Sequence, residues 1–185
     1  MYNTNPNFLR SMQEHKEEYD RVVTDIWFAA AKDGRIDNIK RLLKRGIKVG
    51  RTIELSGKKG FTALIIAASE GWNEIVKIFL ESGEEVDREN DDGWTPLFLA
   101  SQRSYLDAVK YLVEVGKAEV DKATNIGCTP LYIASQNGHL KVVKWLVEEG
   151  KAKVDKAADG KWTPLMIVKS EGHKEIVDYL KGEKD

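Results

Sequence analysis

The stretch Gly127–Gly150, GCTPLYIASQNGHLKVVKWLVEEG, has the pattern of a complete helix–turn–helix unit. Thr129 can cap a helix whose first position is Pro130, where the missing N–H costs nothing. Gly138 predicts the end of that helix, because glycine adopts the left-handed conformation without a Cβ clash. A second helix then carries an apolar stripe of Val142, Val143, Leu146 and Val147. A unit this small buries little apolar surface alone, so we expect neighbouring copies of it.

The same pattern recurs along the chain at a fixed period. Capping threonines stand at Thr62, Thr95, Thr129 and Thr163, at steps of 33, 34 and 34 residues. Repetition at this period indicates stacked supersecondary units. The apolar stripe recurs in register in the other units, as Ile75, Val76, Phe79 and Leu80, then Ala108, Val109, Leu112 and Val113, then Ile176, Val177 and Leu180.

These motifs and their spacing resemble the ankyrin repeat family over residues 25–181. The resemblance implies an all-α fold, an α-solenoid of stacked ankyrin-type helix–turn–helix repeats with β-hairpin loops. We expect an N-terminal tail and capping helix over residues 1–21, followed by a repeat domain over residues 22–185. The five repeats of that domain are expected at residues 22–58, 59–91, 92–125, 126–159 and 160–183.

Several positions depart from the family pattern. Ser104 replaces the turn glycine of the third unit, where a left-handed conformation would strain a residue with a side chain. Lys161 stands at the glycine position before Trp162 in the last unit. The histidine that the family places after Thr-Pro-Leu gives way to apolar or aromatic side chains, so apolar packing is expected instead: Ile65, Phe98, Tyr132 and Met166. Aspartates that can accept backbone hydrogen bonds precede the hairpins: Asp87, Asp121 and Asp155.

The first part of the chain predicts an additional helix from Pro6. Its apolar residues lie near one face, at Phe8, Leu9, Met12 and Tyr19. We expect this helix to cover the open end of the stack, and the alternative is an amphipathic helix that binds a partner. The inner helix of the first repeat lacks Thr-Pro-Leu and is expected to be capped by Thr24 or Asp25.

Residues 47–60 form an insertion between the first and second repeats. Apolar and polar residues alternate there, which predicts a longer β-hairpin. It is either a tolerated surface insertion, since added loop residues cost little, or a binding feature.

Composition and charge favour a soluble protein inside the cell. The chain of 185 residues has a net charge of −1 and a single cysteine, Cys128. A disulfide within the chain is therefore excluded, as is a zinc site built from several cysteines. Met1 to Arg10 lacks the pattern of a secretory signal, and no apolar run is long enough for a membrane span. We expect a cytoplasmic monomer without membrane insertion, although the sequence leaves the nucleus open as a location.

The sequence contains no catalytic constellation, so we expect no enzymatic activity, no metal site and no cofactor. His139 and His173 occupy equivalent repeat positions, where we expect structural contacts at the starts of helices. Cys128 with His139 could form a nucleophilic pair, but activation would require close geometry and an orienting third group. Gly57-Lys58-Lys59-Gly60 lacks the spacing of a phosphate-binding loop.

The resemblance implies that a protein or peptide partner binds the concave surface of inner helices and hairpin tips. Trp94 and Trp162 suit binding anchors, or else they pack one hairpin on the next. The expected contact residues are Phe61, Glu70, Arg88, Asp91, Asp92, Trp94, Gln102, Arg103, Asn125, Cys128, Gln136, Asn137 and Trp162.

Charge is unevenly distributed and supports two other functions. Basic residues dominate from Lys32 to Lys59, and acidic residues dominate from Glu81 to Thr95. The basic repeat could bind an acidic ligand, nucleic acid or phosphoinositide, but no aromatic residues alternate with the basic ones, which disfavours nucleic acid. The other alternative is a structural spacer that binds no specific partner.

Overall fold

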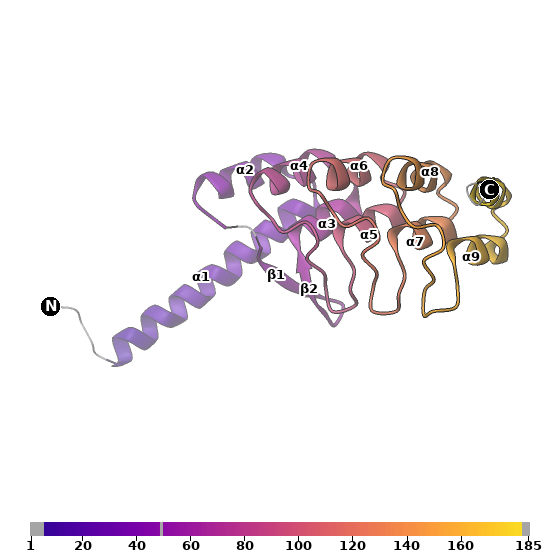
Figure 1. Ribbon diagram of the computed structural model, residues 1–185. Helices are drawn as coiled ribbons and strands as arrows, with labels where there is room; N and C mark the ends of the chain where they lie inside the picture. The colour runs from indigo at the N-terminus through magenta and orange to yellow at the C-terminus, as the bar shows by residue number, and fades with distance from the viewer. Residues whose placement is uncertain (1–5, 49, 183–185) are drawn as a thin grey trace.

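The computed structural model describes residues 6–48 and 50–182, with side chains from Glu14 onward (Figure 1). The described residues form stacked pairs of antiparallel helices and one two-stranded sheet. The inner row consists of α1 (Pro6–Lys32), α3 (Ala63–Glu70), α5 (Pro96–Gln102), α7 (Pro130–Gln136) and α9 (Pro164–Glu171). The outer row consists of α2 (Ile36–Lys44), α4 (Asn73–Glu81), α6 (Leu106–Glu114), α8 (Leu140–Glu148) and α10 (Lys174–Gly182).

The inner helices begin where the capping threonines predicted. Thr95 and Thr129 have extended backbones, and each hydroxyl accepts the N–H three residues later at 3.1 Å. This cap satisfies an amide that the helix itself leaves free. Both rows share one continuous core in which the predicted stripes are buried, for example Val142, Val143 and Leu146. The predicted α-solenoid is confirmed.

The N-terminal helix differs from the expectation. Residues 6–32 form one continuous helix, so the predicted helix start at Thr24 or Asp25 is wrong. Thr24 donates its hydroxyl hydrogen to the carbonyl oxygen of Asp20, one turn back. The expected extra helix and the first inner helix are therefore one uninterrupted helix. The first half of α1 extends beyond the stack instead of lying across its end (Figure 1), and the Tyr19 side chain is 60% exposed. Phe8, Leu9 and Met12 lie outside the residues whose side chains are described.

The insertion forms the predicted hairpin. β1 (Thr52–Leu55) pairs antiparallel with β2 (Lys58–Thr62), with Ile53 opposite Phe61. The backbone of β2 then joins the next hairpin, because the Asp91 amide donates to the Lys59 carbonyl at 3.1 Å. Later hairpins repeat this contact, from Asn125 to Asp92 and from Asp159 to Ile126. The hairpins therefore form a ladder beside the inner helices.

Two of the aspartates before the hairpins also connect neighbouring repeats. Asp87 accepts the backbone N–H of Glu119, and Asp121 accepts that of Lys153, each at 3.1 Å. We expected aspartate acceptors for backbone amides in a turn, and the structure places the donors in the following repeat.

Aromatic rings of one unit cover the helix–turn of the unit before it. A Cβ atom at Gly71 would lie 2.7 Å from the Tyr105 ring, and one at Gly138 would lie 2.7 Å from the His173 ring. Ser104 holds the corresponding turn in the third unit, with φ at 64°. The predicted left-handed conformation of this serine is confirmed.

We expect Ser104→Gly to raise the free energy of unfolding by about 1 kcal/mol, because glycine removes the strain of a left-handed L-residue. Ser82→Gly is the matched control, since Ser82 also ends a helix but has φ at −83°, where glycine brings entropy and no relief. Urea denaturation followed by circular dichroism measures both. A loss of stability in Ser104→Gly would contradict this account.

Candidate functional site

A second apolar cluster runs along the inner surface, beside the ladder of hairpins. It includes Phe61, Phe98, Cys128 and Tyr132, all at most 9% exposed. Phe61 and Cys128 were expected to contact a partner, which requires exposed side chains. The structure corrects this expectation, because the neighbouring hairpins and inner helices cover both of them.

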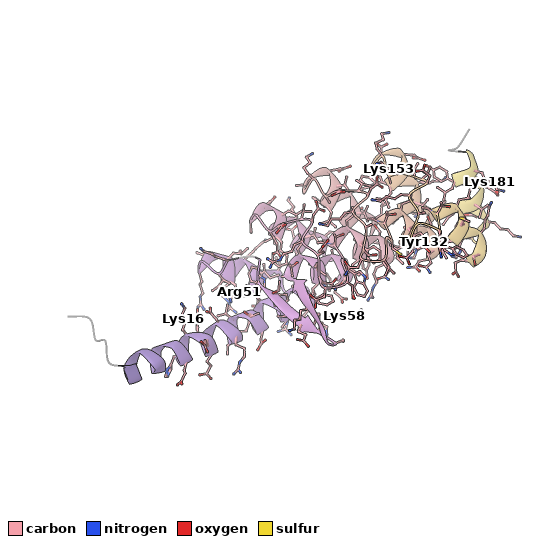
Figure 2. The ribbon with its side chains drawn as sticks, turned by 60° about the horizontal axis from the view of Figure 1, so that its bottom comes forward. Lys16, Arg51, Lys58, Tyr132, Lys153 and Lys181 are labelled. Carbon is pink, nitrogen blue, oxygen red and sulfur yellow. The ribbon has the colours of Figure 1, made fainter. Side chains whose placement is uncertain are left out.

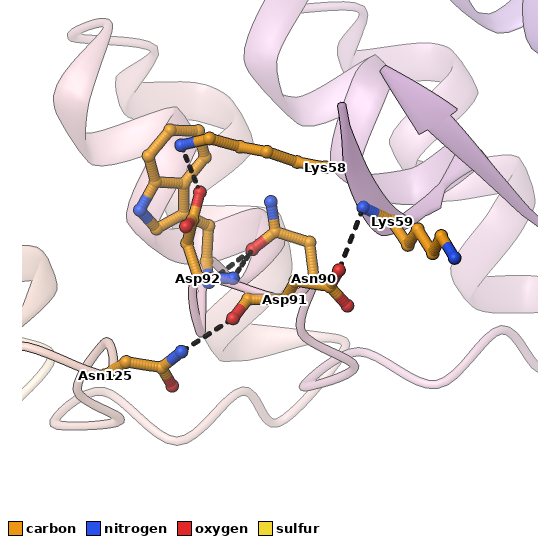
Figure 3. A network of polar contacts seen from close by, with 7 residues as sticks. Lys58, Lys59, Asn90, Asp91, Asp92 and Asn125 are labelled. Carbon is orange, nitrogen blue, oxygen red and sulfur yellow. Dashed lines mark hydrogen bonds and ion pairs between the residues drawn. The ribbon is translucent and has the colours of Figure 1, made fainter. Parts of the chain in front are cut away.

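Trp94 is half-buried within the ladder. Its ring stacks on Phe98 with centroids 6.3 Å apart, and the Lys58 ammonium lies 4.4 Å from the ring centroid. The same ammonium pairs with the Asp92 carboxylate at 2.5 Å (Figure 3). Of the two roles expected for Trp94, these contacts favour packing between hairpins. The inserted hairpin supplies Lys58, a residue that the candidate list missed.

The other polar residues at the hairpin tips also bond to neighbouring repeats. The Lys59 amide donates to the Asp91 carboxylate at 3.1 Å, and the Asn125 amide group donates to the Asp91 carbonyl at 2.6 Å (Figure 3). Arg88 donates to the carbonyl of Gly50 at 2.8 Å. These side chains therefore hold neighbouring hairpins at a fixed distance.

Asn90, at the same hairpin tip, is buried and holds the turn together, a role that was not predicted for it. Its side-chain oxygen accepts the amides of Asp92 at 3.1 Å and of Trp94 at 2.9 Å. The run Asn-Asp-Asp-Gly before Trp94 is a turn signal that could have identified it.

Polar residues that follow the inner helices also connect neighbouring repeats, at the helix ends away from the hairpins. Nε2 of His139 lies 2.8 Å from the Gln102 carbonyl oxygen, and Nε2 of His173 lies 3.0 Å from that of Gln136. Asn137 donates to the Gln102 carbonyl at 3.0 Å. The structural role predicted for these two histidines is confirmed.

The remaining candidates lie on the surface, and one of them is a large apolar side chain. Trp162 is 45% exposed, and Met166, four residues later, is 51% exposed. Phe98 and Tyr132, at the position of Met166 in earlier units, are at most 8% exposed. We call Trp162 and Met166 the terminal anchor. Four further expected contact residues, not yet described, also have half-buried or exposed side chains: Glu70, Gln102, Arg103 and Gln136.

Met166 and Ile126 were not among the expected contact residues. Ile126, at a hairpin tip, is 61% exposed. The missing family histidine could not have identified Met166, because Ile65, Phe98 and Tyr132 also lack it and are buried.

Two carboxylates, one buried and one half-buried, have perturbed pKa values. Burial is the largest influence on Glu84 and raises its pKa, and the hydrogen bond from the Leu64 amide at 3.3 Å opposes that shift. Burial likewise raises the pKa of Asp87, against the hydrogen bond from Glu119. Leu64 stands in the first turn of α3, so Glu84 stabilises a helix start. Both carboxylates are thus accounted for by structural bonds.

Cys128 lacks the environment of a reactive thiol. Burial raises its pKa, and a hydrogen bond with Thr124 opposes this shift only in part. Cys128 precedes the first turn of α7 whereas His139 follows its last, and the His139 ring is engaged with Gln102. The arrangement does not support a nucleophilic pair.

We expect Cys128 to react slowly with a thiol reagent in the folded protein. A raised pKa leaves less thiolate at a given pH, so the labelling rate should still be rising above pH 9.0, the ordinary value of this thiol. The rate measured from pH 7 to 10, with and without urea, checks this, since Cys128 is the single cysteine. A fast rate that levels off below pH 8 would refute it.

Within residues 6–48 and 50–182, no three histidine, cysteine, aspartate or glutamate side chains gather as metal ligands would. The helices of that same part of the chain are too short or too polar to cross a membrane.

Comparison with known proteins agrees with this geometry. A family model of ankyrin repeats, built from three copies, matches residues 26–124 and again residues 116–185. The two matches together span nearly all of the repeat stack. No curated protein matches the chain. Ankyrin repeat domains are typically non-catalytic and generally mediate contacts between proteins. The chain therefore belongs to the ankyrin repeat family.

Proposed function

We propose that this chain is a non-catalytic binding module that holds a protein or peptide through its inner helices and hairpin tips. The terminal anchor carries the proposal. Met166 is exposed at a position where Phe98 and Tyr132 are buried. Trp162 is exposed at a position where earlier units have buried or half-buried side chains. Tryptophan is one of the side chains that most often dominate the binding energy of a protein interface. Gln102, Arg103 and Gln136 supply polar contacts along the same row of inner helices.

The bonds between repeats support binding by a preformed surface. Asn125 and Asn137 each connect their own repeat to the one before. A surface that is ordered before the partner arrives loses little conformational entropy on binding. We further propose a monomer in the cytoplasm, and the single cysteine, which forms no disulfide within the chain, fits a reducing compartment.

Truncation of the terminal anchor tests the proposal. We expect Trp162→Ala/Met166→Ala to lose captured partners in affinity purification followed by mass spectrometry, because the anchor side chains are gone. The urea midpoint should change little, since both side chains are about half exposed. Val115→Ala is the matched control, because Val115 is 53% exposed at the end of α6, in the outer row. Identical partner sets for all three proteins would contradict the proposal and favour the spacer.

The basic first repeat supports a second candidate function. Arg41, Lys44 and Arg45 are exposed on and next to α2, and within the described residues none of the three pairs with a carboxylate. An acidic ligand such as phosphoinositide would meet them without displacing an ion pair. We expect binding to phosphoinositide vesicles that weakens with salt and is lost in Lys44→Glu/Lys48→Glu. Failure to bind at low salt would eliminate this candidate.

A further inference from the structure

Helix α1 has two apolar faces, and one of them is exposed. Val23, Trp27 and Ala30 are at most 5% exposed and face the stack. Tyr19, Val22 and Ile26 are 60%, 46% and 43% exposed. Spacings of three and four residues place these three side chains on one side of the helix, and exposed Ala29 continues the row. We call Tyr19, Val22, Ile26 and Ala29 the α1 seam. It extends over about 15 Å.

An inner helix in the middle of the stack leaves no such seam. α3 contacts α1 on one side and α5 on the other, and its residues from Ala63 to Ala68 are all buried. α1 contacts α2 and α3, and its first half extends beyond both of them (Figures 1 and 2). The seam therefore has the residue spacing of a helix–helix contact but lacks the second helix among the described residues.

A groove continues this surface from Asp25 and Ala29. It has a volume of about 310 Å³ and lies between α1, the inserted hairpin and α3. Phe28, Ile53 and Ile66 line its floor, and Leu55 at the hairpin is 39% exposed. The inserted hairpin forms the side of the groove opposite α1. A large apolar side chain from an approaching helix would fill it.

The charges beside the seam and groove define the partner. Glu18, Asp25 and Glu70 are exposed, and the structure shows no ion pair for any of them within its described residues. Lys32 is the basic residue that lines the groove. A second copy packed antiparallel about the middle of the seam would bring Glu18 of one copy close to Asp25 of the other, which is unfavourable. Lysine or arginine beside the apolar stripe of a partner would complement them.

We propose that the α1 seam and its groove bind an amphipathic helix of a partner protein whose apolar stripe is flanked by lysine or arginine. The partner helix lies along Tyr19, Val22 and Ile26, places a large apolar side chain in the groove and pairs its basic residues with Asp25 and Glu70. This surface is independent of the terminal anchor, so the two can be tested separately.

The probe is a fluorescein-labelled peptide of three heptads, with leucine at the a and d positions and lysine at the e and g positions. A matched peptide carries glutamate at e and g. We expect the intact protein to bind the lysine peptide at least about tenfold more tightly than the glutamate peptide, measured by fluorescence anisotropy. Charge reversal in Asp25→Lys/Glu70→Lys should narrow or invert that ratio.

Variants of the α1 seam test whether the lysine peptide binds there. Val22→Glu/Ile26→Glu should weaken the lysine peptide at least about tenfold, because it puts charge in the apolar contact. Val115→Glu, at a comparably exposed valine outside the seam, should leave the affinity for the lysine peptide unchanged, and so should Trp162→Ala. Circular dichroism confirms that each variant is folded. Equal affinity for both peptides, or unchanged binding by the seam variant, would overturn the proposal. So would a dimer in sedimentation equilibrium that the seam variant dissociates, because a second copy would then occupy the seam.

Discussion

Trp27→Ala is expected to lower the free energy of unfolding by about 3–5 kcal/mol, the range for truncating a large buried aromatic side chain. Trp27 is fully buried, and its ring centroid lies 5.2 Å from that of Phe79 in α4. Trp27 thus joins the first repeat to the second. Since repeats are stabilised mainly by their neighbours, we expect α1 and α2 to lose structure before the rest.

Urea denaturation and hydrogen exchange of the α1 amides measure this effect. Trp27→Phe is the matched variant. The Trp27 indole N–H is buried without an acceptor among the described residues, so phenylalanine removes an unsatisfied donor while keeping an aromatic ring. Trp27→Phe should therefore lose clearly less stability than Trp27→Ala. A midpoint for Trp27→Ala equal to that of the intact protein would mean that Trp27 does not hold the first repeat.

The elements that the sequence predicts well are those decided within a few residues. Thr129 and Pro130 fix a helix start through a local hydrogen bond and a fixed φ angle. Val142, Val143 and Leu146 fix the buried face of α8 through their own spacing. Ser104 is strained because its turn requires a left-handed residue, whatever residue stands there. Each of these predictions needed no knowledge of a distant segment.

The length of α1 could not be predicted in the same way. Thr24 can cap a new helix or bond back to Asp20 within a continuing one, and no glycine or proline between Asp20 and Asp25 decides between them. In the structure Arg51 donates to the Thr24 hydroxyl at 2.9 Å and pairs with Asp20 at 3.3 Å. A residue of the insertion thus bridges one turn of α1, which local sequence reasoning cannot reveal.

The exposure of the expected contact residues could not be predicted for the same reason. Position in the repeat suggested that Phe61, Trp94, Cys128 and Trp162 share one environment, yet their exposure depends on what the adjoining units place against them. Lys58 and Phe98 cover Trp94, whereas Trp162 stays open in the last unit. The sequence supplied the chemistry of each position, and the stacking of neighbours decided which positions are exposed.

Gly93→Ala should be the most damaging single change in the ladder of hairpins. Gly93 has φ at +78°, and a Cβ atom there would lie 2.7 Å from the backbone nitrogen of Asn125. That nitrogen donates to the Asp92 carbonyl at 3.1 Å, so the added methyl group would push apart two hydrogen-bonded hairpins. We expect a loss of about 1–2 kcal/mol from the left-handed strain and a further 1–3 kcal/mol from the overlap.

Gly83→Ala separates these two contributions. Gly83 has φ at +81°, but no atom lies within 4 Å of its added Cβ, so this variant carries the strain alone. Urea denaturation of both variants gives the overlap as the difference between their losses. Equal losses would show that the hairpins move apart to accept the methyl group without a further loss of stability. A larger loss in Gly93→Ala would show that close backbone approach holds the ladder rigid, and such rigidity is what the proposed binding through a preformed surface requires.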